Sequence, residues 1–352
     1  MKGKLNWRTD DGGELFICNC ISVNTEITDN GVEESREWAA DGTLYPARPA
    51  HRRRSNGIPA IHKGLGWFDW LPLIALPACV VALKNQMAAW VFMWALAGAI
   101  FMGCKWLTWR RARLAGLRPS IGRSLAYFFA WPGMDAAEFL TDKNFGPKRC
   151  RKHWFFATAK TACGAAILWL AAKGIFGTRP LLTGWMGMLG IILFLHFGLF
   201  ELLALLWQSA GVNANPVMRQ PLAATSLAEF WSTRWNTAFN ALAHELAFRP
   251  LARKFGAVRA TLVVFLISGL VHEIVISLPA RGGFGLPTAY FVFQGIGVLL
   301  ERSALGRRAG LGRGFRGWLF MGIWAGAPAF WLFHPPFVTN VILPMLHPIG
   351  AK

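Results

Sequence analysis

The chain has 352 residues, of which 54% are hydrophobic and only 16% are charged. Soluble domains carry about 25% charged residues, so this composition excludes an ordinary soluble domain and predicts a multi-spanning membrane protein. The net charge of +19 does not point to a nucleic-acid partner, because the basic residues stand in short segments between apolar runs. The six cysteines show no metal or redox spacing, so we expect no metal site.

The first 64 residues differ from the rest of the chain. They are polar and mixed in charge, without sustained periodicity, and the first 60 contain no apolar core long enough for a signal peptide. We interpret residues 1–64 as a disordered or weakly ordered cytosolic leader, followed by a membrane domain over residues 65–352.

Apolar segments then follow one another to the end of the chain, at about 66–83, 88–109, 154–176, 186–208, 258–278, 287–300, 316–333 and 336–346. Crossing the hydrocarbon core takes about 20 apolar residues, so a shorter segment at 124–134 is predicted to be re-entrant or interfacial. The expected fold is all-α and polytopic, with about 7–9 transmembrane helices plus re-entrant or interfacial helices. Within it, Gly184, Gly187 and Gly190 are predicted to form a close helix-packing face.

Basic residues are concentrated in four segments, at 105–123, 143–152, 249–259 and 302–316. One alternating topology places all four on the same side as the leader, provided that residues 124–134 do not cross. The positive-inside rule then predicts a cytosolic N-terminus and places residues 209–257 on the cytosolic face. We expect a multi-pass protein of the inner (cytoplasmic) membrane.

The cytosolic segment contains an aromatic, amphipathic stretch. Ser226 and Glu229 have the spacing of a capping box at a helix start. Apolar side chains then recur at near-helical spacing, at Phe230, Trp231, Trp235, Phe239 and Leu242. This pattern predicts an amphipathic helix at the interface or between spans, and a purely peripheral anchor helix is the alternative.

His272 and Glu273 lie inside the apolar run 258–278. Ionisable groups in a membrane are costly, so they indicate a functional site facing a polar cavity. The alternative is a histidine whose ring nitrogens are satisfied by neighbouring helices. Ser268 shares the helical face of His272, whereas Glu273 is turned about 100° away.

A neutral imidazole is suited to act as a general base. Asn236 offers an amide that can donate to an oxyanion or orient the histidine. His196 is a second intramembrane candidate, with Glu201 five residues later.

These segments carry a resemblance to a known family. Residues 226–236, SLAEFWSTRWN, resemble the FW-x-x-RW-N/H signature of the wax-synthase-like branch of the membrane-bound O-acyltransferases. Residues 265–273, FLISGLVHE, are similar to that family's SG-x-x-HE segment, and residues 127–135 resemble a further segment of this branch. The likeness covers about residues 120–305 and leaves the leader uncovered.

The resemblance implies a multi-helical acyltransferase in which His272 is the catalytic histidine and Asn236 its partner. It also implies acyl-CoA as co-substrate, no further cofactor, and a lipid alcohol that meets the donor in a membrane tunnel. Ser232 and Thr233 stand where many relatives have Gly-Arg, which leaves the acceptor open. The expected substrate-binding residues are Trp231, Arg234, Trp235, Ser268, Glu273 and His196.

The predicted reaction is direct transfer of an acyl group from a thioester to a hydroxyl, with His272 as base and Asn236 steadying the intermediate. Arg234 and the basic loops either attract the CoA phosphates or serve as topology determinants. One alternative is O-acetylation of an extracytoplasmic glycan. Another is a proton-coupled transporter, which should show internal repeats that the sequence does not clearly display. Membrane lipids are expected partners, and the oligomeric state stays open.

Overall fold

The computed structural model describes residues 36–38, 44–46, 64–141, 151–175 and 179–350. The chain divides into two units, residues 1–58 and 59–352. In the first unit, β1 (Arg36–Trp38) pairs antiparallel with β2 (Leu44–Pro46). The other residues of the leader, up to residue 63, lie outside the described residues, so the prediction of a disordered leader stays a prediction.

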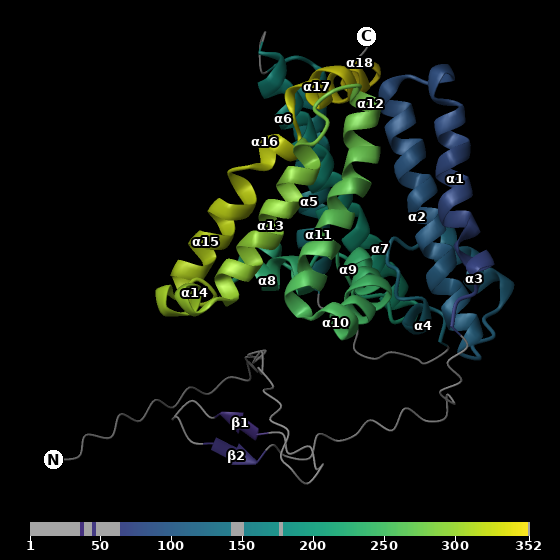
Figure 1. Cartoon of the computed structure of the whole chain (residues 1–352). Helices are drawn as coiled ribbons and strands as arrows, with labels where there is room; N and C mark the ends of the chain where they lie inside the picture. Colours follow the sequence, from purple (N-terminus) through teal and green to yellow (C-terminus); the bar gives the residue numbers. More distant parts are fainter. Residues whose placement is uncertain (1–35, 39–43, 47–63, 142–150, 176–178, 351–352) are drawn as a thin grey trace, which may run out of the picture. The chain divides into compact units, whose positions relative to one another are not determined.

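The second unit is helical throughout its described residues (Figure 1). Its first half contains α1 (Leu71–Ala82), α2 (Ala89–Leu114), α3 (Ile121–Phe129), α4 (Ala136–Phe139), α5 (Arg151–Ala172), α6 (Pro180–Ile191) and α7 (Phe200–Ser209). The second half contains α8 (Leu227–Glu229), α9 (Thr237–Ala243), α10 (Arg249–Phe255), α11 (Ala257–His272), α12 (Leu278–Ala280), α13 (Leu286–Arg302), α14 (Ala304–Ala309), α15 (Gly314–Gly326), α16 (Ala329–Leu332), α17 (Pro335–Phe337) and α18 (Leu343–Gly350).

Short helical pieces of other types join these elements. The 3₁₀ turns are η1 (Trp67–Trp70), η2 (Lys84–Gln86) and η4 (Pro221–Ala223). The π-helical stretches are η3 (Ile192–Leu199), η5 (Phe230–Arg234), η6 (His244–Phe248), η7 (Glu273–Ser277) and η8 (Val338–Ile342). Such π-turns are often found at functional sites; η5 lies within the first motif segment, and η7 begins at the last residue of the second.

Four helices among the described residues are long and apolar enough to cross a membrane: Ala89–Leu114, Arg151–Ala172, Pro180–Ser209 and Ala257–Ala280. The helices Gly314–Leu332 and Pro335–Gly350 are bent by 61° relative to each other, and if this pair forms one span the number of candidate spans is five. The predicted count of 7–9 is not confirmed. The apolar runs at 66–83 and 287–300 form α1 and α13, with 12 and 17 residues, and at 1.5 Å per residue both fall short of a core about 30 Å thick.

Close helix packing occurs where the glycine face was predicted. A β-carbon on Gly184 would lie 2.2 Å from Val338 Cγ1, and one on Gly190 would lie 2.7 Å from the backbone nitrogen of Leu168. Only glycine fits at such distances, so α6 packs directly against η8 and α5.

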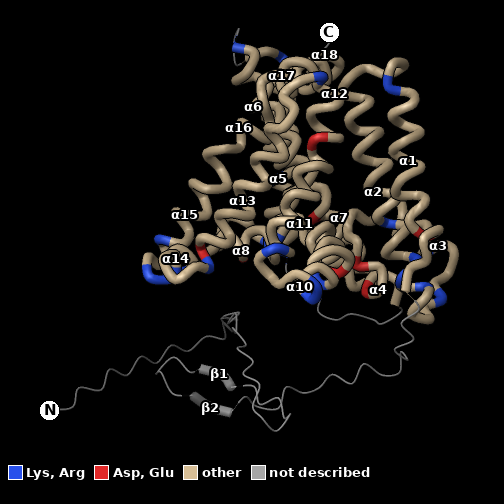
Figure 2. Tube along the Cα trace, in the orientation of Figure 1, with Lys and Arg blue, Asp and Glu red and all other residues tan. Residues whose placement is uncertain are grey.

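Basic side chains gather at one end of the helical unit. Figure 2 shows them on α3, α10 and α14, whereas α12 and α17 lie at the other end. This agrees with the expectation that the basic segments share one side. Of the segment 143–152, only residues 151 and 152 are described, and the cytosolic orientation of this end stays a prediction.

Lys105 corrects one element of the charge pattern. It was counted with the basic segment 105–123, but α2 continues to Leu114 and Lys105 is fully buried within it. Its Nζ donates to the carbonyl oxygens of Tyr127 (2.6 Å) and Gly133 (2.7 Å), and it lies 3.6 Å from the centre of the Tyr127 ring. Lys105 therefore holds α3 and the following loop against α2, and α3, with nine residues, is too short to span, as expected.

We expect Lys105→Met to lower the stability of the protein by about 2–4 kcal/mol, because it leaves two buried carbonyl oxygens without a donor. The apparent melting temperature in detergent measures the effect. The matched control is Lys254→Met, which removes an exposed cation on α10. Equal melting temperatures for the two variants would contradict the assignment.

Candidate active site

His272 is the last residue of α11, at the point where the helix passes into η7. Its Nδ1 lies 2.6 Å from the backbone carbonyl oxygen of Ser268. A carbonyl oxygen only accepts, so Nδ1 carries the proton and, in the neutral imidazole, Nε2 keeps the free lone pair. Among the described residues, Nε2 makes no hydrogen bond. The local helix thus fixes the tautomer in which Nε2 is the basic nitrogen.

The aromatic motif does not form the continuous helix that its spacing predicts. Ser226 Oγ accepts from the backbone nitrogen of Glu229 (2.9 Å), as in the predicted capping box. In a capping box the Glu229 carboxylate would accept from the backbone nitrogen of Ser226. Here it accepts instead from the backbone nitrogen of Thr225, one residue earlier in the chain (2.9 Å). The helix then ends after η5, since Trp235 is extended and Asn236 adopts a left-handed conformation with φ 45° and ψ 58°. The prediction of one helix through this segment is therefore wrong.

Asn236 forms the turn between η5 and α9. Non-glycine residues rarely adopt this conformation, asparagine is one of the few that tolerate it, and such residues concentrate at functional sites. The turn is closed by Asn240, whose side-chain amide donates to the carbonyl oxygen of Trp231 (2.6 Å). The backbone nitrogen of Asn236 lies 3.3 Å from Met218 Sδ, and its side-chain amide has no hydrogen bond among the described residues. The amide is therefore available to a ligand.

Helix α13 joins the two motif segments. The Phe291 ring lies 4.2 Å from the imidazole of His272 and 5.6 Å from Trp231, measured between ring centres. Trp231 Nε1 also donates to Gln294 Oε1 (3.3 Å). Within the described residues, no hydrogen bond or ring contact joins Asn236 directly to His272. The two segments are thus placed relative to each other through Phe291 and Gln294 on α13 and through the direct contact of Trp231 with Phe265, whose ring centres are 6.1 Å apart.

Glu301, near the end of the same helix, holds the start of α8. Its buried carboxylate accepts from the backbone nitrogens of Leu227 (2.5 Å) and Ala228 (3.3 Å). These amides have no partner within their own helix, and a carboxylate at a helix N-terminus is favoured by the helix dipole. Gln294 and Glu301 are not among the predicted site residues, although both are polar groups in or beside the apolar run 287–300, the signal that singled out His272.

Glu273 is engaged with α13 rather than with His272. Its Oε1 accepts from the backbone nitrogens of Gly285 (2.9 Å) and Thr288 (3.0 Å) and from the Thr288 hydroxyl (3.0 Å). It therefore caps the N-terminus of α13. Its Oε2 is buried without a partner among the described residues. Its expected part in substrate binding stays a prediction.

The remaining expected residues lie around the aromatic motif. Arg234 forms an ion pair with Glu229 (2.6 Å). Trp235 stacks on Phe230, with ring centres 5.5 Å apart, and meets Phe197 edge-on at 6.2 Å. His196, the neighbour of Phe197, has a buried Nδ1 without a partner among the described residues. The span that carries His196 thus contacts the motif, and the substrate-binding roles of these residues stay predictions.

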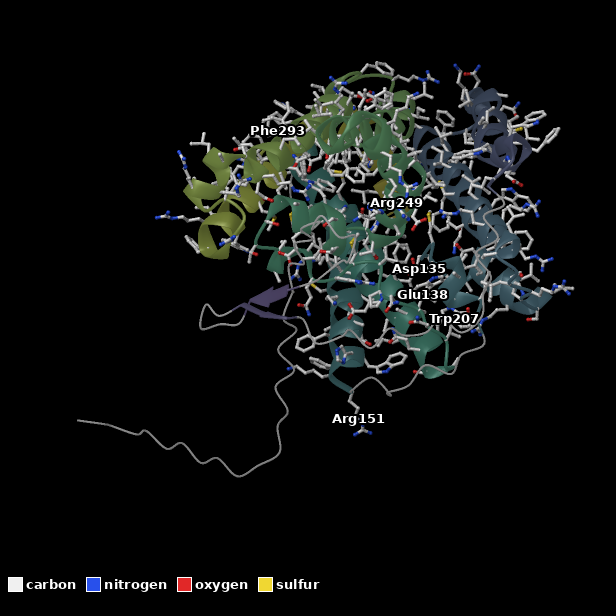
Figure 3. The ribbon with its side chains drawn as sticks, turned by 60° about the horizontal axis from the view of Figure 1, so that its bottom comes forward. Asp135, Glu138, Arg151, Trp207, Arg249 and Phe293 are labelled. Carbon is white, nitrogen blue, oxygen red and sulfur yellow. The ribbon has the colours of Figure 1, made fainter. Side chains whose placement is uncertain are left out.

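A cavity of about 360 Å³ opens at the end that carries the basic helices. Figure 3 shows Asp135 and Glu138, which line it together with Arg111 and Glu245. Burial, and after it the neighbouring Glu138 carboxylate, raises the pKa of Asp135. Arg111 is paired with Glu245 (2.6 Å), so the lining leaves no unpaired cation for an anionic group.

Part of the chain matches a known protein family. Residues 214–293 match the sequence profile of a family described as the membrane bound O-acyl transferase family. The expected resemblance to this family is confirmed. The matched region contains both motif segments and α13 as far as Phe293, so it includes the Phe291 contact between Trp231 and His272.

Curated relatives share a similar stretch of sequence. A probable long-chain-alcohol O-fatty-acyltransferase 7 of Arabidopsis thaliana is 27% identical, over 37% of this chain and 42% of its own length. A probable long-chain-alcohol O-fatty-acyltransferase 2 of the same plant is 32% identical, over 39% and 43%. A long-chain-alcohol O-fatty-acyltransferase of Simmondsia chinensis is 29% identical, over 37% and 40%. The chain thus covers about two-fifths of the length of each of these relatives, and the similarity is to the wax-synthase-like branch.

The Glu229–Arg234 pair predicts a pH dependence. Burial alone raises the pKa of the Glu229 carboxyl, but hydrogen bonds from Thr225 and Arg234 outweigh it and hold this pKa below its ordinary value of 4.5. The stabilisation is therefore present above pH 4.5 and is lost as the pH falls through the lowered pKa. We expect Glu229→Gln to melt lower than the wild type at pH 7, by an amount equivalent to about 1–2 kcal/mol, and the gap to close in acid. A gap of constant size across the pH range would contradict this origin.

Proposed function

We propose that the protein is a membrane-embedded O-acyltransferase that transfers a fatty acyl group from acyl-CoA to the hydroxyl of a lipid alcohol. The observation that carries the proposal is the hydrogen bond from His272 Nδ1 to the Ser268 carbonyl, which leaves Nε2 as the free base. The family match over residues 214–293 supports the acyltransferase class. The names of the curated relatives support a long-chain alcohol as the acceptor.

In the proposed reaction, His272 Nε2 takes the proton of the acceptor hydroxyl while the hydroxyl oxygen attacks the carbonyl carbon of the thioester. The negative charge that develops on the carbonyl oxygen is stabilised by a hydrogen bond from the Asn236 amide. The carbon–sulfur bond then breaks, and the CoA thiolate takes back the proton from the imidazolium. The products are an ester and free CoA, and the histidine returns to its starting tautomer.

The donor is proposed to approach from the end of the unit that carries α10 and α14. Arg253, Lys254 and Arg308 are exposed there and attract the phosphates of CoA by their long-range field. Arg234 is less suited to this role, because its guanidinium is already paired with Glu229 and lies 3.3 Å from the carbonyl oxygens of Arg219 and Gln220. We therefore propose that Arg234 stabilises the conformation of the aromatic motif and does not bind CoA.

We expect His272→Ala to lower ester formation by about 10²–10⁴-fold, the usual contribution of a general base. The assay incubates membranes carrying the protein with labelled acyl-CoAs and a panel of long-chain alcohols, diacylglycerols and sterols. His347→Ala, which removes an exposed histidine on α18, is the matched control and should keep full activity. Equal ester formation by wild type and His272→Ala would overturn the proposal.

The role of the Asn236 amide is separable from its backbone conformation. Glycine adopts the left-handed region freely, so Asn236→Gly should lose the amide while its free energy of unfolding stays within about 1 kcal/mol of the wild-type value. We expect a drop of about 10²-fold or more in turnover. Asn236→Ala should lose both activity and stability, because alanine is strained at φ 45°. Full turnover by Asn236→Gly would show that the amide has no part in the reaction.

A further inference from the structure

A second cavity lies at the opposite end of the unit from the basic helices. It has a volume of about 540 Å³, within the range of about 300–1,000 Å³ typical of small-molecule sites. The turn between α1 and α2, the short helix α12 and the π-helix η8 form its walls. Figure 1 shows α12 at the end of the bundle away from α10 and α14. The cavity is thus distinct from the site around His272.

Two cations line this cavity, and neither has a partner. Lys84 and Arg281 are its charged lining residues, without an acidic residue beside them. Within the described part of the chain, neither side chain makes an ion pair or a hydrogen bond. At the other end, by contrast, Arg111 and Arg234 are paired with carboxylates. The cavity therefore carries an uncompensated positive charge of two.

The backbone at Arg281 adds an independent observation. Arg281 follows α12 with φ 53° and ψ 35°, a left-handed conformation that costs a non-glycine residue stability. The next two residues, Gly282 and Gly283, show that the chain uses glycine freely in this turn. Among the described residues the guanidinium makes no hydrogen bond or ion pair, so no described contact of this side chain offsets the strain.

The rest of the lining combines the amides of Asn85 and Asn340 with apolar side chains at the ends of two candidate spans. Phe92 and Pro279 are buried, and Leu278 is half-buried beside them. Phe92 belongs to the first turn of the span Ala89–Leu114, and Pro279 ends the span Ala257–Ala280. This depth corresponds to the membrane interface, where a lipid head group meets its acyl chains. Two cations and two amides beside apolar side chains match a phosphate head group that is attached to an acyl chain.

We propose that this cavity binds an anionic phospholipid, with Lys84 and Arg281 on its phosphate and with Phe92 and Leu278 against its glycerol and first methylenes. Arginine favours phosphate because its planar fork donates two parallel hydrogen bonds. The bound lipid relieves the two unpaired charges and fixes the turn between α1 and α2 against α12. This site is independent of the acyl transfer, since no residue that lines it takes part in the proposed reaction.

The test compares lipid retention by the purified full-length protein. Wild type is exchanged into detergent with equal amounts of phosphatidylglycerol and phosphatidylcholine, and bound lipid is counted by mass spectrometry of the intact complex. The variants are Lys84→Gln, Arg281→Gln and the double substitution. Arg179→Gln is the matched control, because Arg179 is an exposed cation outside the cavity. Size-exclusion profiles and melting temperatures confirm that each variant is folded.

We expect wild type to retain phosphatidylglycerol in preference to phosphatidylcholine, and the double variant to lose this preference by about tenfold or more, as the removal of two charge-assisted contacts implies. Arg179→Gln should behave as wild type. Arg281→Gly should melt higher than wild type in phosphatidylcholine alone, because the strain is gone, yet gain less from added phosphatidylglycerol.

Three results would overturn the proposal. The first is equal retention of phosphatidylglycerol by wild type and the double variant. The second is an equal loss in Arg179→Gln, which would indicate nonspecific attraction to the surface. The third is binding of radiolabelled inorganic phosphate that depends on Lys84 and Arg281 without any preference among lipids, which would assign the cavity to free phosphate.

Discussion

The contact of Phe291 with both His272 and Trp231 is the interaction on which the candidate site depends. The two motif segments meet directly where Trp231 contacts Phe265 edge-on, with ring centres 6.1 Å apart. His272 and Asn236, which are 36 residues apart in sequence, share no hydrogen bond or ring contact among the described residues, so their relative position also depends on α13, against which both segments pack. That helix is in turn fixed at both ends by carboxylates. Glu273 caps its beginning, and Glu301 reaches from its last turn to the start of α8. The aromatic motif and the helix that carries His272 therefore both pack against α13, whose two ends are fixed by these carboxylates.

This arrangement explains why acidic groups occur at such apolar positions. A carboxylate in a membrane domain is tolerated when backbone amides compensate it, and helix N-termini supply such amides without a counter-charge. Glu273 and Glu301 both use this solution. In Lys105 the roles are reversed, because its buried ammonium group donates to backbone carbonyl oxygens that have no partner within a helix. Glu273, Glu301 and Lys105 thus neutralise helix ends, and His272, whose Nε2 makes no hydrogen bond among the described residues, differs from them.

Several features of the candidate site could be predicted from the sequence, because the energetic cost of an ionisable residue in an apolar run and the spacing of residues along a helix are both local properties. An ionisable residue in an apolar run is visible without a structure, and so are the spacing of Ser268 and His272 and the helix start at Ser226. The break at Asn236 was not visible, since the aromatic residues on both sides keep near-helical spacing. The turn is imposed by Asn240 and by packing against Met218, which are tertiary contacts. The span count failed for a related reason: hydropathy measures the apolar length of a segment, whereas capping and bending decide where its helix ends.

Among the described residues, arginines at the two ends of the unit differ in whether carboxylates pair with them, and this difference has a functional consequence. At the basic end, Arg111 and Arg234 are neutralised by nearby carboxylates, so they shape the fold and leave long-range attraction to the exposed cations on α10 and α14. At the other end, Arg281 has a strained left-handed backbone, and its side chain makes no ion pair or hydrogen bond among the described residues. A protein that sorts most of its cations to one side gains nothing in topology from two cations in a cavity on the opposite side. The phospholipid that we propose accounts for them, because it brings its own negative charge to the membrane interface.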